Sequence, residues 1–303
     1  EHVGTRLAGG PGDDAVHLVD PVPEPVPGGG PMNVAVAVAR LGGPSAFVGG
    51  ISNDEYGDLL WNHLVENGVE LSLSRRIDAP TARAIVEHVP ELRFRFEGRD
   101  TADTRLASID RSAIGPDDIV HGGTLGMFRG PTAATLADLV EHHGGLVSLD
   151  PNIRPQIIDD PAGWHAFHDR WLPHVDLYKG SDEDLAWIWP DLDPADAAQR
   201  LLDRGVSAIV VTRGGDGLEI VTADGEVGAR PPAVDVVDTV GAGDTIVGAI
   251  LTSIWELRAQ GAATLEDLDA GSWQMLAERA VAAAAVTCSR AGADVPYRRE
   301  LDW

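Results

Sequence analysis

Residues 238–244 read Asp-Thr-Val-Gly-Ala-Gly-Asp, and an apolar run with helical periodicity follows them at residues 245–257. A glycine-rich turn that opens a helix presents unpaired N–H groups and the positive end of the helix dipole to an anion. Asp244 would place an ionised carboxylate at the start of that helix, close to where an attacking hydroxyl must lose its proton. The stretch therefore predicts an anion site with Asp244 as a general base. A tight turn whose aspartate only caps the helix is the alternative.

A second glycine cluster lies near the start of the chain. Residues 28–33 read Gly-Gly-Gly-Pro-Met-Asn and precede an apolar helical run at residues 34–42. Three glycines let a ligand approach the backbone closely, and Asn33 at the helix start offers both a donor and an acceptor to sugar hydroxyls. A capping asparagine after a flexible turn is the structural alternative.

Short β-branched runs alternate with helical patterns from about residue 110 onward. This alternation predicts repeated βαβ units, and hence an α/β fold with a parallel sheet that helices cover on both faces. Ligands bind at the carboxyl ends of the strands in such a sheet. The predicted strands are 119–121, 146–150, 175–178 and 208–212, and the predicted helices are 131–143, 162–172 and 194–204.

The N-terminal third has a different pattern. Residues 15–19, 82–88 and 92–96 are short strand patterns with polar breaks. They indicate a small β-sheet that projects from the main body as a lid. We expect its strands within residues 10–25 and 80–105.

Two helices are predicted between these lid strands, at residues 33–41 and 54–67. The second has Asn53 or Asp54 as its N-cap and Gly68 as its stop. The chain has 303 residues, of which 44% are apolar. That is enough for one large core with a small appendage, so we expect a single domain.

The composition excludes several classes of partner. The formal net charge is −25, so the surface repels nucleic acid and anionic membranes, which proteins hold with basic patches. No stretch reaches the length of a spanning helix, and the first residues lack the pattern of a secretory signal. The lone Cys288 cannot form an internal disulfide, and we expect a cytoplasmic protein. A nucleotide site on so acidic a chain would need a divalent cation and oriented backbone amides.

Together, the two glycine clusters resemble the two signatures of the ribokinase-like (PfkB-type) carbohydrate kinases. The resemblance runs from about Gly28 to the C-terminus. It implies a Rossmann-like domain with a β-sheet lid, ATP as the donor, and transfer of the terminal phosphoryl group to a sugar alcohol. Asp244 would then be the catalytic base. The amides of Gly241, Ala242 and Gly243 would form the anion hole.

The same resemblance places the sugar at Gly29, Gly30 and Asn33. Residues 150–155, Asp-Pro-Asn-Ile-Arg-Pro, resemble a segment shared by fructokinases and 2-keto-3-deoxygluconate kinases. In that segment the arginine, here Arg154, faces the substrate. A surface arginine in a loop is the alternative, although the ligand edge of a parallel sheet favours a functional one.

Other positions depart from the fructokinase pattern. In the lid, Glu97 and Gly98 stand in place of a tyrosine and an arginine, which weakens the assignment of fructose. Relatives begin with an apolar strand ending in Gly-Glu-x-x-x-Asp, whose aspartate binds sugar hydroxyls. Either Thr5 replaces that aspartate here, or the first strand lies upstream of Glu1.

Two segments resemble the nucleotide side of the family. Residues 211–217 resemble a Thr-x-Gly-x-x-Gly loop that lies against ATP, although an ordinary turn would look the same. Residues 179–184 resemble an Asn-x-x-Glu segment that orders magnesium and phosphates, although a capped helix start would also explain them. The implied nucleotide-binding residues are Lys179, Ser181, Thr212, Gly214, Gly217, Asp238 and Thr239, with Asp184 contacting the metal through water.

The sequence therefore predicts an ATP- and Mg²⁺-dependent kinase of a ketose or ketose-like sugar. Alternative acceptors are 2-keto-3-deoxygluconate, ribose and a nucleoside. A catalytically weak sugar- or nucleotide-binding relative is an alternative of another class, and the intact Asp244 motif argues against it. A neutral acceptor is favoured because Glu97 and Gly98 offer no cation to a carboxylate, which leaves Arg99 and Arg154 for that purpose. A monovalent cation and a homodimer formed through the lid are compatible with the resemblance.

Overall fold

A computed structural model describes residues 6–8, 15–17, 25–89, 91–98, 100–262 and 264–303. Its central sheet consists of six strands: β7 (Val120–Gly123), β8 (Val147–Asp150), β9 (Leu177–Ser181), β10 (Ala208–Thr212), β11 (Leu218–Thr222) and β12 (Gly225–Ala229). They lie in the order β12-β11-β10-β9-β8-β7. The strands from β7 to β10 are parallel, and β11 and β12 extend the sheet as antiparallel strands. The antiparallel pair was not predicted.

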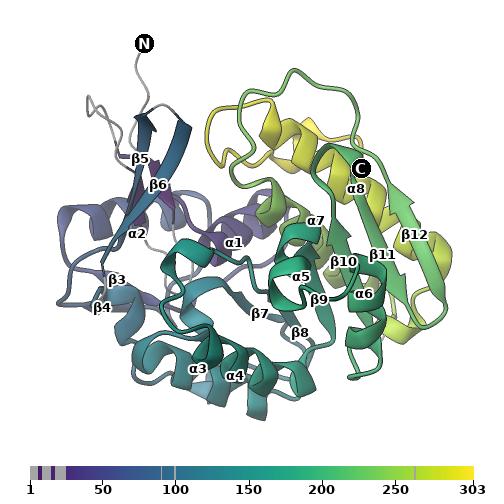
Figure 1. Ribbon diagram of the computed structural model, residues 1–303, viewed down its shortest axis with the longest axis horizontal. Helices are drawn as coiled ribbons and strands as arrows, with labels where there is room; N and C mark the ends of the chain where they lie inside the picture. The colour runs from purple at the N-terminus through teal and green to yellow at the C-terminus, as the bar shows by residue number, and fades with distance from the viewer. Residues whose placement is uncertain (1–5, 9–14, 18–24, 90, 99, 263) are drawn as a thin grey trace.

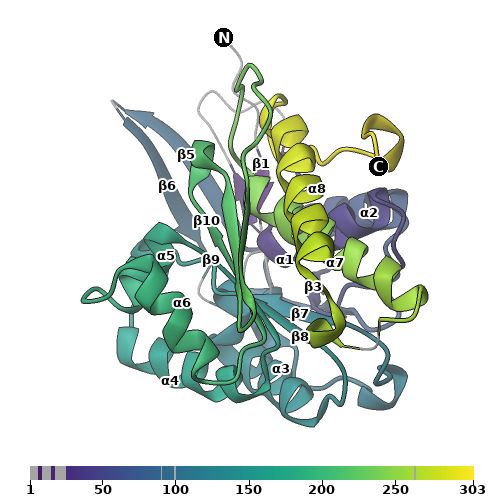
Figure 2. The ribbon, with the colours of Figure 1, turned by 90° about the vertical axis from the view of Figure 1, so that its right-hand side faces the viewer.

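Helices cover both faces of this sheet (Figures 1 and 2). One face carries α3 (Gly130–His142), α4 (Pro161–Trp171), α5 (Asp182–Ile188) and α6 (Pro194–Leu202), and the other carries α1 (Gly30–Arg40), α7 (Ala242–Ala259) and α8 (Ala270–Cys288). Along β10, Ala208 and Val210 pack in the layer of α7 and α8, whereas Ile209 and Val211 pack in the opposite layer. This two-sided burial explains the continuous apolar run of β10 and confirms the predicted α/β fold class.

A small antiparallel sheet projects from this body as the predicted lid (Figure 1). Its strands are β1 (Arg6–Ala8), β2 (Ala15–His17), β5 (Arg83–Val89) and β6 (Glu91–Glu97). β5 pairs with β6 and β1 pairs with β2, while β1 and β2 both lie against β5. Three of the strands fall in the predicted windows, but β1 lies before the first of them. Thr5 and Arg99 lie outside the described residues.

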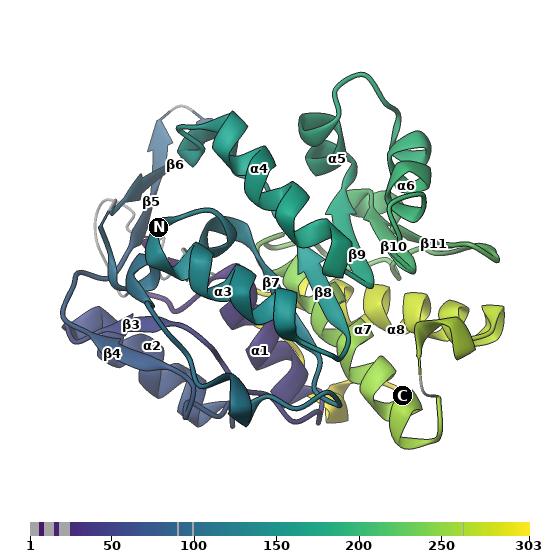
Figure 3. The same ribbon diagram turned by 90° about the horizontal axis from the view of Figure 1, so that it is seen from below.

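The N-terminal part also forms a short two-stranded parallel sheet, which lies beside the main sheet in Figure 3. It consists of β3 (Gly50–Ser52) and β4 (Arg75–Ile77), with α2 (Glu55–Glu66) next to them. The carboxylate of Asp54 accepts a hydrogen bond from the amide of Gly57 at 2.8 Å and caps α2. Gly68 follows that helix with a φ of 78°, as its prediction as a stop requires.

Two helices begin earlier than their apolar patterns predicted. α1 starts at Gly30 rather than at residue 33, with Pro31 in its first turn, where the missing N–H costs nothing. α7 starts at Ala242 rather than at residue 245. The polar residues of both motifs therefore lie inside the first turn of a helix. In the described part of the chain, no helix is long and apolar enough to cross a membrane.

Candidate active site

Asn33 of α1 and Asp244 of α7 form a buried pair. Nδ2 of Asn33 donates a hydrogen bond to Oδ2 of Asp244 at 2.8 Å, and both residues are less than a tenth exposed. The two helices pack closely because residue 248 is a glycine, where a Cβ would lie 2.3 Å from the Cβ of Ala37. Asn33 thus holds one oxygen of the carboxylate and leaves Oδ1 for another partner.

Burial raises the pKa of Asp244 above its usual range. The hydrogen bond from Asn33 and the charges of Lys179 and Arg154 counteract part of this rise. A carboxylate with a raised pKa is a stronger proton acceptor, which suits a general base. Asn33, which the sequence analysis assigned to the sugar, contacts this carboxylate directly.

The turn before α7 has the features of an anion site. Gly241 has a φ of 79°, and a Cβ there would lie 2.6 Å from the Cβ of Ala293, so glycine is required. The amide of Ala242 donates to the carbonyl of Thr239 at 3.3 Å. Among the described residues, we find no hydrogen-bond partner for the amides of Gly241 and Gly243. These two amides and the dipole of an 18-residue helix can therefore stabilise an anion at this turn.

Lys179, the only lysine of the chain, lies on β9 beside this turn. Its Nζ is 2.9 Å from Oδ2 of Asp150 at the end of β8, and both side chains are buried. A Cβ at Gly243 would lie 3.1 Å from the same Nζ. The ammonium group is thus placed between a carboxylate and the proposed anion turn.

Three carboxylates influence this lysine. Burial raises the pKa of Asp150 to about 6, with Lys179 opposing the shift and Asp184 and Asp244 adding to it. Burial alone would lower the pKa of Lys179, but Asp150, Asp184 and Asp244 outweigh it and raise the pKa. Lys179 therefore stays charged, and the cluster as a whole carries an excess of acid that a bound cation would relieve.

Asp184 joins two loops of the site. Its Oδ1 accepts from the amide of Ile153 at 2.8 Å, and its Oδ2 accepts from the amide of Ser181 at 2.9 Å. The Ser181 side chain in turn accepts from the amide of Asp184, which completes a capping box at α5. Each carboxylate oxygen keeps lone-pair capacity for water, so the predicted water-mediated metal contact stays a prediction.

Thr124 and Asn152 also lie at this candidate site, although they were not predicted from the sequence. They follow the ends of β7 and β8 with φ values of 52° and 42°, and they are the described non-glycine residues with positive φ. Asn152 Nδ2 donates to Thr124 Oγ1 at 3.4 Å. A threonine in this conformation is strained, and such strain persists mainly where function requires it. The only sequence signal was the position of Asn152 just after a strand.

These side chains enclose a small space beside the base. A Cβ at Gly30 would lie 2.9 Å from Thr124 Oγ1, 3.1 Å from Asn152 Nδ2 and 3.7 Å from Asp244 Oδ1. Gly30 therefore leaves room that any other residue would fill. Two polar side chains and the free carboxylate oxygen line this space, as a site for a hydroxyl-bearing substrate would require.

The remaining predicted residues lie around this centre. Arg154 donates from Nη1 to the carbonyl of Ile153 at 2.9 Å, and its charge reaches Asp244. Gly29 is the N-cap of α1, with a φ of 139°. On the nucleotide side, Thr212 pairs in register with Ser181 at the ends of β10 and β9.

The loops after β10 and β12 contain three more of the predicted nucleotide-binding residues. Gly214 and Gly217 have φ values of 51° and 98°, so the loop after β10 depends on glycine. Asp238 accepts from the amide of Val240 at 3.1 Å and from the amide of Gly292 at 2.9 Å. Asp238 thus ties the turn before α7 to the loop after α8, which is a positioning contact.

A model of the pfkB family of carbohydrate kinases matches residues 16–299. The chain belongs to this family. Among its relatives, the fructokinase of Salmonella typhimurium is 33% identical over 91% of both chains, and that of Escherichia coli is 31% identical over 94% of this chain and 95% of the relative. The predicted ATP-dependent sugar kinase of the ribokinase-like group is thereby confirmed.

Solved structures of this family have the same fold as the chain. A fructokinase of Xylella fastidiosa with bound ATP is 26% identical with a TM-score of 0.82, over 96% of this chain and 93% of that one. A fructokinase variant of Vibrio cholerae O395 with fructose, ADP and potassium ion bound is 26% identical with a TM-score of 0.79 over the same shares. An aminoimidazole riboside kinase of Salmonella enterica is 26% identical with a TM-score of 0.79, over 98% and 97%.

Proposed function

We propose that this chain transfers the terminal phosphoryl group of ATP to a hydroxyl of fructose. The observation that carries the proposal is the position of Asp244. Its free Oδ1 faces the space beside Gly30, and the carboxylate stands at the start of a helix whose amides can hold an anion. Fructose is the substrate of choice because fructokinases are similar over nine tenths of the chain, and one solved relative contains fructose and ADP.

The proposed reaction uses the chain's own groups in a simple way. The sugar hydroxyl attacks the terminal phosphorus of ATP and passes its proton to Oδ1 of Asp244. The bond from that phosphorus to the bridging oxygen breaks, and ADP leaves. Lys179 and the free amides of Gly241 and Gly243 stabilise the negative charge during transfer. Asn33 keeps the carboxylate oriented throughout.

The proposed reaction also uses magnesium and a monovalent cation. Magnesium bound to the phosphates of ATP would neutralise part of their charge. In the described part of the chain, no group of three His, Cys, Asp or Glu side chains could hold a metal by itself. A hydrated ion held by the phosphates, with Asp184 contacting it through water, fits this donor set. Potassium in the Vibrio cholerae relative supports the proposal that a monovalent cation also acts here.

The ion pair in the lid favours a neutral sugar over a sugar acid as the acceptor. Glu97 forms an ion pair with Arg83, with 2.8 Å between Oε2 and Nη2. The guanidinium of Arg83 is therefore engaged, and a substrate carboxylate would compete with Glu97 for it. Arg154 is the described guanidinium whose charge reaches the base. One exposed arginine is a weak basis for binding a carboxylate, so we propose a neutral ketose.

An acceptor panel tests this proposal. ADP release is measured with ATP and magnesium for fructose, 2-keto-3-deoxygluconate, ribose and aminoimidazole riboside, and we expect the highest kcat/KM with fructose. Arg154→Ala and Arg99→Ala are measured beside Arg204→Ala, an exposed control that pairs with Asp169. The neutral-ketose proposal fails if the sugar acid is the better substrate and loses about 2 kcal/mol of transition-state binding in either site variant.

Two further proposals concern the cellular location and the oligomeric state of the enzyme. A kinase that consumes ATP works where ATP is abundant, so we propose a cytoplasmic location. The small lid sheet is also the proposed contact of a homodimer. Light scattering on the purified chain measures its mass, and a monomer at working concentration would contradict the dimer.

A further inference from the structure

Helices α1 and α7 carry the buried pair of the candidate site in their first turns, and they run parallel from there. Asn33 contacts Asp244 near the start of both helices. About one turn later, a Cβ at Gly248 would lie 2.3 Å from the Cβ of Ala37. Residue numbers thus rise together along the two helices. The candidate site therefore lies at one end of this helix pair.

The relative position of the two helices decides whether Asn33 reaches Asp244. Their hydrogen bond of 2.8 Å is the one direct side-chain hydrogen bond between α1 and α7 in the described structure. The close approach at Gly248 is an apolar contact, which leaves movement along the helix axes open. Hydrogen bonds weaken steeply with distance and angle, so a relative shift of about 1–2 Å is enough to weaken this one.

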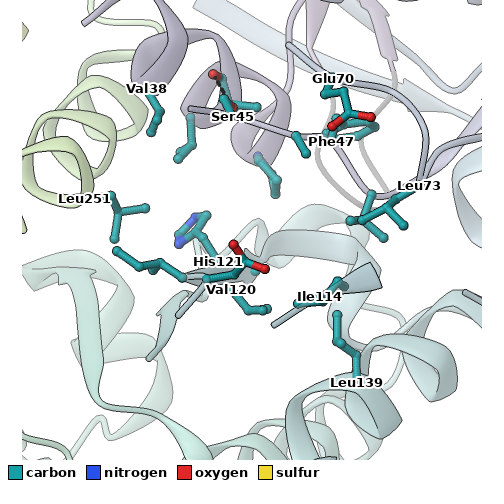
Figure 4. A pocket seen from close by; sticks show the side chains of 18 of the residues that line it. Val38, Ser45, Phe47, Glu70, Leu73, Ile114, Val120, His121, Leu139 and Leu251 are labelled. Atoms are coloured by element: carbon teal, nitrogen blue, oxygen red, sulfur yellow. Dashed lines mark hydrogen bonds between the residues drawn. The ribbon is translucent and has the colours of Figure 1, made fainter. Parts of the chain in front are cut away.

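The side of the two helices that faces β7 is incompletely packed. Val38 of α1 and Leu251 of α7 line a cavity of about 560 Å³, and Val120 and Leu139 lie on its opposite side (Figure 4). Atoms beside a cavity have fewer van der Waals partners. Packing on this side therefore restrains α1 and α7 less than a filled core would, and contacts elsewhere contribute more to their alignment.

Residues 294–303, which we call the terminal segment, contact the far end of α1. Nη1 of Arg40, the last residue of α1, donates to Oδ1 of Asp294 at 2.7 Å and to the carbonyl of Val295 at 2.6 Å. The Arg40 guanidinium also lies 4.7 Å from the centre of the Tyr297 ring. The side chain of Arg40 is only 12% exposed, so water screens these contacts little.

The terminal segment also holds α7, through Arg298. Nη1 of Arg298 donates to Oε1 of Glu256 near the end of α7 and, at 3.4 Å, to the carbonyl of Leu41 at the C-cap of α1. Oε2 of Glu256 accepts from Nη1 of Arg279 on α8 at 2.9 Å. One guanidinium thus joins the C-terminal ends of α1 and α7, and one carboxylate joins α7 to α8.

The terminal segment is itself anchored on the core. Val295 is fully buried, and Trp303 packs against the apolar layer of α7 and α8. The guanidinium groups of Arg279 and Arg298 lie 4.7 and 5.0 Å from the centre of the Trp303 ring, as in cation–π contacts. Nε of Arg298 donates to the carbonyl of Trp303 at 2.8 Å. Arg298 is therefore part of a network, whereas an isolated surface ion pair would contribute little.

We propose that the terminal segment fixes α1 relative to α7 and thereby holds Asn33 on Asp244, with Arg298 as a positioning residue. Arg298 acts at a distance, because the eight residues from Asn33 to Leu41 span about 12 Å of helix. The two helices transmit the restraint as rigid rods. This inference rests on the proposed role of Asp244 as the base, and it does not depend on which sugar is phosphorylated.

The proposal predicts a change in the titration of the base. The hydrogen bond from Asn33 stabilises the carboxylate and opposes the rise that burial causes in the pKa of Asp244. A weaker bond lets Asp244 keep its proton to higher pH, so the acid limb of kcat/KM moves to higher pH. Lys179, Arg154 and Asp150 are the other charges that act between Asp244 and its surroundings, and none of them is hydrogen-bonded to the terminal segment.

A double-variant cycle tests this prediction. kcat/KM is measured across pH for the parent, Arg298→Met, Asn33→Ala and the double variant, with the acceptor that gives the highest turnover. Methionine keeps an apolar stem over Trp303 and removes the guanidinium. We expect the acid limb of Arg298→Met to rise by about 0.3 pH unit or more, which is a twofold loss on that limb, and that of Asn33→Ala to rise further. In the Asn33→Ala background, Arg298→Met should add no shift.

Two further variants accompany the cycle. Arg170→Met is the matched control, because Nη2 of Arg170 pairs with Oε2 of Glu141 at 3.0 Å and ties α4 to α3 on the opposite face of the sheet. It should leave the acid limb unchanged in both backgrounds. Glu256→Gln keeps the shape of the side chain and weakens the same tie, so it replaces Arg298→Met in the cycle if that variant folds poorly.

Urea titrations of the same proteins give a readout that is independent of activity. Substitutions more than about 7–10 Å apart usually have additive effects on stability. We expect the losses from Arg298→Met and Asn33→Ala to be less than additive, and those from Arg170→Met and Asn33→Ala to add. Additive losses for the first pair would overturn the proposal, as would an acid-limb shift that is equal with and without Asn33. Coupled stability with an unchanged acid limb would keep the restraint and contradict Asp244 as the base.

Discussion

Asp244 is the third residue of α7, where a carboxylate can both stabilise the helix N-terminus and reach a substrate. The substitution Asp244→Asn distinguishes between these two roles. We expect kcat to fall by ~10²–10⁴ because the proton acceptor is lost, while the Kd for ATP changes little. Steady-state kinetics with fructose and ATP titration by calorimetry measure the two quantities.

Asp196 provides a matched control for this variant. It occupies the same third position in α6 and is exposed, with no contact to the site. Asp196→Asn should change kcat by less than twofold, although it removes a charge from an equivalent helix turn. A near-native kcat for folded Asp244→Asn would show that Asp244 is only a cap.

Thr124 retains a strained backbone and directs its hydroxyl to the space beside Gly30. Thr124→Ala removes the hydroxyl and keeps the Cβ. If that hydroxyl binds the acceptor, the KM for the sugar should rise roughly three- to tenfold, with the KM for ATP unchanged. Thr124→Ser restores the hydroxyl and should recover most of the affinity. An unchanged sugar KM in Thr124→Ala would restrict the residue to a structural role.

At the scale of the element, the N-terminus of α7 is the proposed binding site for the phosphoryl group. Gly243→Val would bring a side chain to within 3.1 Å of Lys179 Nζ at its Cβ, in the space expected for the phosphoryl group. We expect it to lose activity more than stability, by at least tenfold in kcat/KM with only a few degrees in Tm. Kinetics and thermal melts measure both effects.

The same substitution in α8 controls for the loss of a helix glycine. Gly271 is the second residue of α8, as Gly243 is of α7, and the nearest atom to its Cβ would be Oδ1 of Asp269 at 3.5 Å. Gly271→Val should leave kcat/KM unchanged. Unchanged kinetics in Gly243→Val as well would mean that no phosphate passes near this turn. Gly241, and not Gly243, has the positive φ of the turn before α7.

At the scale of the whole molecule, buried histidines make stability depend on pH. His168 is 1% exposed, stacks on Trp164 and lies 3.0 Å from the hydroxyl of Tyr178. Burial lowers its pKa to about 3, whereas an unfolded histidine titrates near 6.5. The unfolded chain therefore binds the proton more readily, and the stability is full above pH 6.5 and lost on acidification. Between pH 7.5 and 5.5 the loss is about 1.4 kcal/mol for this residue.

His168→Phe isolates this contribution. Phenylalanine can still stack on Trp164, and the variant should lose less stability than the parent between pH 7.5 and 5.5 in urea titrations. Asp103 and Asp150 act in the opposite direction, because burial raises the pKa of each to about 6 and favours the folded state at lower pH. They are present in both proteins, so their effect cancels in the difference. An identical pH dependence in parent and variant would contradict the neutral buried His168.

The elements that depend on local pattern were predictable. The apolar run of β10, the capping residue Asp54 and the stop at Gly68 each act within a few residues, so their structural role shows in the sequence. Short strands such as β3 and β4 were not predicted, because three residues give no periodicity. Their existence depends on pairing with each other.

By itself, the sequence determined the α/β class and the sugar-kinase family, and it predicted Asp244 as the base. Alternating strand and helix patterns are local, and residues 238–244 contain both the turn and the carboxylate. Only the tertiary structure decided that Asn33 bonds to Asp244 across 211 positions, and that Thr124 and Asn152 lie with Asp244 around the space beside Gly30. It also brought residues 46–48 and 119–122 to the lining of one cavity. These relations join segments that are distant along the chain, and their relative placement depends on the packing of the whole core.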